Sequence, residues 1–163
     1  AKKIVAAEML KPGFRFIALS QRMANDEVSE TEIISVALDN SVIQFVQGND
    51  ATIVCFGYSL VHGKSLISAI RDLGRTASLF TVNYVRDANW GIAVLEASKN
   101  KKLVIIDDTR GPTSLAFRFL ADVLEFDKNV VFTIVRNRED LSTTVSDEKF
   151  DFKSEEVIAQ VFG

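Results

Sequence analysis

The sequence has very few of the residues on which metal centres and disulfide frameworks depend. Its 163 residues include one cysteine, Cys55, and one histidine, His62. A single cysteine excludes an internal disulfide and a multi-cysteine metal site, and a single histidine excludes a histidine cluster. We therefore expect no cysteine- or histidine-based metal site in this chain. Free cysteine and no disulfide favour a reducing compartment, and we expect the cytoplasm or another such compartment.

Basic stripes and long apolar runs are also missing from the sequence. The chain carries 19 Lys and Arg residues against 22 Asp and Glu residues, a net charge of −3. Nucleic-acid binding depends on clustered basic residues, so we expect no nucleic-acid partner. No apolar run approaches the roughly 20 residues that cross a bilayer, so we expect no membrane partner. No signal peptide is recognisable, and the start at Ala1 indicates a trimmed chain or a piece of a longer one.

The composition that is present is that of an ordinary globular domain, with 47% hydrophobic and 25% charged residues. The stretch Asp50–Ile70 organises the rest. Residues 51–56 are apolar and rich in β-branched side chains, which predicts a strand buried on both faces. Gly57 permits a sharp turn and Ser59 is a candidate N-cap of the following helix. The apolar face of that helix is predicted to contain Leu66, Ile67, Ile70 and Leu73.

Strands and helices alternate over the remainder of the chain. Further strands are predicted over 41–46, 77–85, 101–108 and 129–135, and further helices over 88–100, 113–126 and 154–162, the last capped by Ser154. Leu115, Phe119, Val123 and Phe126 form the predicted apolar stripe of helix 113–126. The turn signal "QGND" predicts a hairpin between strands 41–46 and 51–56. This alternation predicts an α/β fold, a three-layer α/β/α sandwich with a mostly parallel sheet.

The first 40 residues form a separate predicted segment, which precedes the domain 41–163. Residues 1–11 have a loose helical stripe, Pro12 and Gly13 end it, and residues 14–19 are predicted to be a strand. Residues 20–40 are polar and acidic and are predicted to be a linker, with a helical turn or a short strand near residues 33–37.

Charged residues gather where the predicted strands end. Asp107, Asp108 and Arg110 follow one strand, and Arg136 follows the next. Ligands of open α/β sheets bind at the carboxyl ends of the strands, so these side chains could hold a cation, a hydroxyl group or a small anion. Helix capping and salt bridging explain the same residues, and the sequence favours that explanation for the two aspartates. His62 is either a lone ligand contact near a helix N-terminus or a half-buried residue of the first turn.

No catalytic set emerges from the sequence. "GYSLVHGKS", residues 57–65, resembles a phosphate-binding loop, but five residues separate its glycines where that loop has four. We therefore interpret it as a structural turn. Cys55 lies inside a predicted buried strand, where a thiol is usually an inert apolar group. No serine lies in a nucleophile elbow, and we assign no catalytic residue and no metal ligand.

The organising stretch "GNDATIVCFGYSLVHGKSLISAI" resembles the start of the C-terminal domain of transketolase-like thiamine diphosphate enzymes. That group includes transketolase, deoxyxylulose phosphate synthase and the beta subunit of the 2-oxoacid dehydrogenase first component. "FTVNYVRDANWGIAVLEASKNKKLVIIDD" is similar to the next strand, helix and acidic strand end, and "VVFTIVRNRED" to the closing strand. "GFRFIALSQR" resembles the last strand of the preceding pyrimidine-binding domain.

The resemblance implies a domain that supports dimerisation and assembly and is not catalytic on its own. The cofactors of the assembled enzyme would be thiamine diphosphate and Mg²⁺, held by other domains or subunits, since this chain lacks the "GDG…N" pattern that binds them. The partners implied are a second copy and the cofactor-binding chains. Asn83, Asp87–Asn89 and the lone Gly111 depart from the family pattern and indicate a divergent member. The alternative is a stand-alone regulatory module that binds small anions through Asp107, Asp108, Arg110 and Arg136.

Overall fold

The fold was described from a computed structural model of the chain. The structure describes residues 9, 33–36, 41–83, 88–108, 115–136 and 152–163. The chain divides into two compact units, Ala1–Glu30 and Thr31–Gly163. The predicted helix 1–11, apart from Met9, and the predicted strand 14–19 lie outside the described residues. The assignment of residues 1–40 to a preceding domain and linker therefore stays a prediction.

The second unit contains one six-stranded sheet in the order β1-β2-β4-β3-β5-β6. Its strands are β1 Ser35–Val36, β2 Val42–Val46, β3 Ala51–Phe56, β4 Ala77–Val82, β5 Lys102–Asp107 and β6 Val131–Arg136. The four strands β4-β3-β5-β6 are parallel, and β2 pairs antiparallel with β4 and with β1. The predicted mostly parallel sheet is therefore confirmed.

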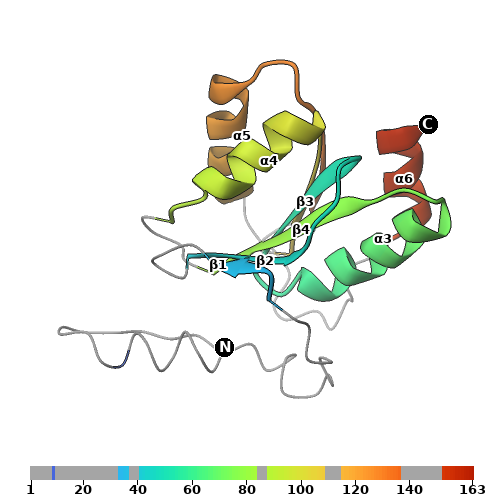
Figure 1. Cartoon of the computed structure of the whole chain (residues 1–163), viewed down its shortest axis with the longest axis horizontal. Coiled ribbons are helices and arrows are strands. Elements are labelled where there is room, and N and C mark those ends of the chain that lie inside the picture. Colours follow the sequence, from blue (N-terminus) through green and yellow to red (C-terminus); the bar gives the residue numbers. More distant parts are fainter. Residues whose placement is uncertain (1–8, 10–32, 37–40, 84–87, 109–114, 137–151) are drawn as a thin grey trace, which may run out of the picture. The chain divides into compact units, whose positions relative to one another are not determined.

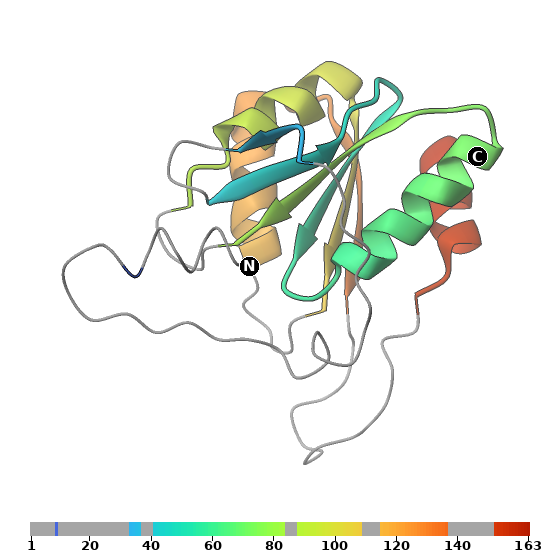
Figure 2. The same cartoon turned by 60° about the horizontal axis from the view of Figure 1, so that its bottom comes forward.

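Four helices cover the two faces of this sheet. They are α3 Leu60–Asp72, α4 Gly91–Asn100, α5 Leu115–Phe126 and α6 Ser154–Phe162. One core cluster joins the sheet to α4 and α5, and a second joins the opposite face to α3 and α6. Figures 1 and 2 show the sheet between these two helical layers. Because strand side chains alternate between faces, Val54 belongs to the first cluster and its neighbours Ile53 and Cys55 to the second. The predicted three-layer α/β/α sandwich is confirmed.

The predicted hairpin between residues 41–46 and 51–56 is wrong. β4 lies between β2 and β3, and β3 has parallel partners on both sides. The "QGND" segment instead carries the chain past the start of β4. There Asp50 accepts hydrogen bonds from the backbone N–H and the hydroxyl of Thr76, and the backbone N–H of Gly48 donates to Ser78 Oγ. β3 is buried along its whole length, and such a strand belongs at the centre of a sheet.

One predicted helix cap is confirmed in position and one is wrong. Ser59 occupies the N-cap position of α3 as predicted, but its hydroxyl makes no capping hydrogen bond and lies within hydrogen-bond distance of the carbonyl oxygens of Phe56 and Ile106 instead. Ser154 is the first residue of α6 and is buried, and Lys153 occupies the N-cap position. α3 ends in a glycine C-cap, since Gly74 has φ +70° and the N–H of Arg75 donates to the carbonyl of Ile70.

Two residues of the predicted apolar stripes do not pack in the core. Leu73 and Phe126 are 55% and 58% exposed, while the other predicted stripe residues are buried or half-buried. Both residues stand at a helix C-terminus, where the last turn leaves the sheet and the chain reverses. The spacing of apolar residues in the sequence does not show where the helix leaves the sheet, so the predicted apolar stripes included these two residues. Among the described residues, no helix combines the length and the apolar character that a bilayer span requires.

Candidate functional site

The candidate site lies where the order of the parallel strands reverses. The chain runs from β3 outward to β4 through α3, then crosses back over β3 to β5 through α4, on the other face. In open α/β sheets the crevice beside such a reversal, at the carboxyl ends of the strands, is the usual ligand site. Here it is the end of β3 and the end of β5, where Phe56 and Asp107 are register partners.

The turn after β3 is tied to β5 by the chain's own polar groups. Gly57 has φ +63°, which a residue with a Cβ adopts only with strain. The backbone N–H of Tyr58 donates to Asp108 Oδ1 over 3.0 Å. The fully buried hydroxyl of Ser59 lies 2.6 Å from the carbonyl oxygen of Phe56 and 2.7 Å from that of Ile106. These contacts tie the ends of β3 and β5 together at the switch point.

Ser59 is the residue whose role the sequence did not reveal. A serine before a helix ordinarily caps it, and its hydroxyl here points to the ends of β3 and β5 instead. The β5 contact joins residues 47 positions apart in the chain, so no local pattern predicts it. One signal was present in the sequence: the turn glycine Gly57 comes directly after a buried strand, and Ser59 lies two residues beyond it.

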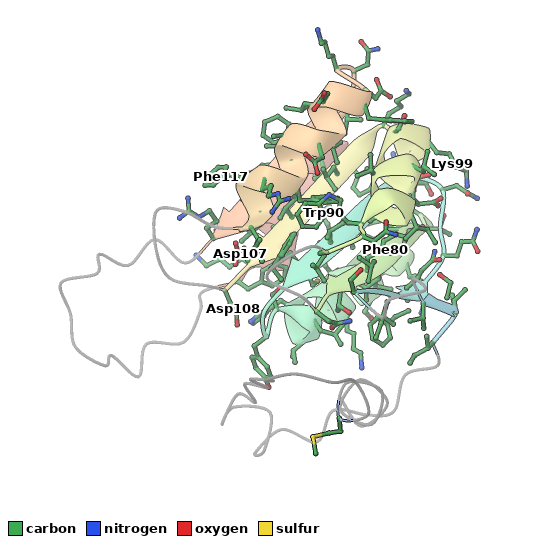
Figure 3. The ribbon with its side chains drawn as sticks, turned by 90° about the vertical axis from the view of Figure 1, so that its left-hand side faces the viewer. Phe80, Trp90, Lys99, Asp107, Asp108 and Phe117 are labelled. Carbon is green, nitrogen blue, oxygen red and sulfur yellow. The ribbon has the colours of Figure 1, made fainter. Side chains whose placement is uncertain are left out.

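The structure brings three of the predicted site residues to one edge of the sheet. Asp107 ends β5 and is fully buried, Asp108 follows it, and Arg136 ends β6 as the register partner of Asp107. The guanidinium of Arg136 lies over the ring of Phe117 on α5, 4.9 Å from its centroid. Figure 3 shows Asp107 and Asp108 at the strand ends below Phe117. Arg110, the fourth member of the predicted anion site, lies outside the described residues.

His62 lies in the first turn of α3 and is half-buried, as one of its two interpretations predicted. Its ring lies 5.0 Å from the ring of Phe152, at an interplanar angle of 37°. Phe152 packs against the core cluster of α3 and α6. The ring contact thus explains the position of His62 as part of the packing of this layer, and its role as a ligand contact remains a prediction.

The glycine pair that resembled a phosphate loop has a packing explanation. Gly63 lies inside α3, and a Cβ on it would come 2.5 Å from Cys55 Sγ and 2.8 Å from Leu79 Cδ1. Gly63 therefore allows α3 to approach the sheet closely, while Gly57 makes the turn. Burial raises the pKa of the Cys55 thiol to about 12, which keeps it protonated and unreactive near neutral pH.

Metal binding has no support among the residues that the structure describes. Within them, no group of three or more His, Cys, Asp and Glu side chains is arranged to hold an ion. The paired aspartates at the end of β5 therefore lack a third ligand of these types in the described part of the chain. What the edge offers chemically is one buried carboxylate, one carboxylate that accepts a backbone hydrogen bond, and one stacked guanidinium.

The sequence matches no protein-family model and no curated protein. Solved structures do match. A split-gene transketolase, described as an inactive beta4 tetramer, superposes with a TM-score of 0.59 at 17% sequence identity. The match covers 73% of this chain and 39% of that chain, so the present sequence spans about two fifths of its neighbour. The likeness establishes a transketolase-like fold.

A transketolase from Campylobacter jejuni is a more distant match, with a TM-score of 0.45 and 8% identity over 79% of this chain and 18% of that one.

Proposed function

We propose that this chain is the C-terminal domain, or a separate subunit equivalent to it, of a thiamine diphosphate-dependent enzyme of the transketolase or 2-oxoacid dehydrogenase type. In this proposal it is not catalytic on its own and supports dimerisation and assembly. The single observation that carries the proposal is the transketolase-like fold, matched over 73% of this chain and 39% of the neighbour. A match of that extent fits a domain-sized part of a longer or divided enzyme.

The neighbour's description adds to this support. The split-gene transketolase is described as an inactive beta4 tetramer, so that protein associates with itself and lacks activity in that form. By analogy, the present chain would self-associate and require cofactor-binding chains for activity.

The candidate site supports a silent role as well. Its switch point is occupied by the Ser59 hydroxyl and the Tyr58–Asp108 hydrogen bond. In the proposal other chains hold thiamine diphosphate and its Mg²⁺, because this sequence lacks the "GDG…N" pattern that binds them.

Reconstitution tests the proposal. The purified chain is mixed with the cofactor-binding chain encoded beside it, or with the remainder of its own reading frame. We expect no thiamine diphosphate binding by the isolated chain in calorimetry, a stable complex in size-exclusion chromatography, and transketolase or 2-oxoacid dehydrogenase activity in the complex alone. A chain that neither self-associates nor binds such partners would refute the proposal.

A second candidate is a stand-alone regulatory module for small anions. The observation that favours it is the placement of Arg136 beside the switch-point edge, one strand from Asp107 and Asp108. Calorimetry of the full chain against phosphate, sulfate and small carboxylates tests it, with Arg110→Ala and Arg136→Ala as controls. Binding that both variants weaken would support this function, and no binding would exclude it.

A further inference from the structure

The two outer strands of the described sheet differ in how they are protected against pairing with another chain. β1 has two residues, and a very short edge strand is one of the ways in which proteins prevent edge-to-edge association. β6 is the last strand on the other side, has six residues, and reads "VFTIVR". It contains no proline, and its one charged residue, Arg136, stands at its end. Among the described residues, β6 therefore shows neither the shortness nor the internal charge or proline that protects an outer strand.

Exposed apolar side chains accompany this strand. Val131 and Phe132 are 63% and 44% exposed, and Phe117 of the adjacent α5 is 44% exposed. Figure 3 shows Phe117 and Trp90 on opposite sides of α5, with Trp90 toward α4. Phe117 is linked to the strand through the guanidinium of Arg136, which lies over its ring. Together, Phe117, Val131, Phe132 and Arg136 form what we call the β6 surface.

The alternation of side chains along β6 makes the strand complementary to itself. Ile134 packs in the α4/α5 cluster and Val135 in the α3/α6 cluster, so Phe132, Ile134 and Arg136 share the α5 side. In an antiparallel pair of identical strands related by a two-fold axis, the central residue faces itself. Centring on Ile134 places Phe132 of each copy opposite Arg136 of the other. Centring on Thr133 places Phe132 opposite Ile134.

Both registers keep like charges apart. The two Arg136 guanidinium groups do not face each other in either of them, and the first register gives each a second aromatic ring. A guanidinium over an aromatic face is attractive, most of all when it is desolvated. Facing like charges would instead oppose pairing.

We infer that β6 is the strand through which two copies of this chain associate, by antiparallel pairing of β6 with β6 of the second copy to form one continuous sheet. The inference rests on the self-association in the proposed function and names its surface. The occupant is a second copy because the strand is self-complementary in length, apolar pattern and charge.

Analytical ultracentrifugation of the full chain tests the inference, with Phe132→Lys as the variant. Lysine on an outer strand opposes pairing. We expect a dimer whose dissociation constant rises about a hundredfold in Phe132→Lys, since each dimer loses two aromatic contacts of roughly tenfold each. The matched control is Leu95→Lys, which places the same charge at a residue of α4 that is 57% exposed. We expect it to leave the dimer unchanged.

The outcomes separate the inference from the proposed function. A wild-type dimer that Phe132→Lys leaves intact, or that Leu95→Lys disrupts, overturns the β6 interface and leaves self-association standing. A monomeric wild-type chain overturns both the interface and self-association. Far-UV circular dichroism checks the fold of each variant. Val131→Lys, on the other side of the same strand, decides the question if Phe132→Lys does not fold.

Discussion

The close approach of α3 to the sheet leads to a sharp prediction about Gly63. A methyl group at this position would come 2.5 Å from Cys55 Sγ and 2.8 Å from Leu79 Cδ1, where about 3.5–4.0 Å is the optimal separation. Both neighbours are buried in adjacent strands, so neither side chain has room to withdraw. Either α3 moves outward by about an ångström or the strands deform.

The size of the effect follows from two opposing contributions. Overpacking of a well-filled core costs about 1–3 kcal/mol, and the better helix propensity of alanine returns about 1 kcal/mol. Because the added methyl group meets two strands at once, we take the upper half of the first range. Gly63→Ala should therefore lower the free energy of unfolding by about 1–2 kcal/mol.

Gly91 provides the matched control. It is the first residue of α4, and a Cβ there would meet one neighbouring atom, Asn89 Oδ1, at an ordinary 3.6 Å. Gly91→Ala should be neutral or stabilise by up to about 1 kcal/mol.

Urea unfolding followed by the fluorescence of the buried Trp90 measures both variants. The double variant Cys55→Ala/Gly63→Ala completes a cycle, because removing Sγ relieves the shorter of the two contacts. We expect a favourable coupling of about 1 kcal/mol. A Gly63→Ala protein as stable as the wild type, or a cycle without coupling, would refute the reasoning.

Three further predictions concern single polar groups. Burial raises the pKa of the Cys55 thiol to about 12, so an aromatic disulfide reagent at pH 8 should modify this thiol only when the chain unfolds. The rate of modification should therefore rise with urea concentration. Immediate labelling of the native chain would contradict this. Ser59→Ala should destabilise by about 1–2 kcal/mol in urea unfolding, because the buried carbonyl oxygens of Phe56 and Ile106 lose the one hydroxyl donor that they share. Ser68→Ala, on the exposed face of α3, should be neutral. Hydrogen bonds from Lys101, Ser98 and the backbone of Asn129 hold the pKa of Asp127 far below its usual range, so the stabilisation that its carboxylate gives to the folded state is present above about pH 4 and is lost as the pH falls. The melting temperature of Asp127→Asn should therefore depend less steeply on pH below about 4 than that of the wild type. Equal slopes for the two proteins would exclude this role.

The fold was predictable from the sequence because its signals are local. Buried strands such as β3 and β5 consist largely of consecutive apolar residues, and in helices such as α5 the apolar residues recur at helical spacing. Each element can therefore be recognised from a window of about ten residues. Pairing is not local. The choice between a β2–β3 hairpin and the insertion of β4 depends on contacts of Gly48 and Asp50 with residues 26 to 30 positions later, which a turn signal does not contain.

For the candidate site, too, the positions of residues could be predicted from the sequence, but their contacts could not. Asp107, Asp108 and Arg136 could be placed at one edge because parallel strands end together, and the structure places all three there. Their partners could not be foreseen, since the stacking of Arg136 on Phe117 and the contact of Ser59 with Ile106 each join separate elements. A strand-end residue is thus locatable from sequence, but whether it serves a ligand or the packing depends on long-range contacts.

These contacts indicate where the function of this chain resides. At the switch point, where an α/β domain ordinarily keeps a crevice, Ser59 and Asp108 bind the chain's own backbone. At the β6 surface the situation is reversed, because Val131 and Phe132 are left exposed beside an outer strand with no charge before its final residue. The engagement of Ser59 and Asp108 by the chain's own backbone at the expected ligand site, and the exposure of apolar groups at the outer strand, are the opposite of what a small-molecule module requires. They are what a domain requires whose task is to hold other chains together, so of the two candidate functions the assembly role is the one that the physical chemistry of the described residues favours.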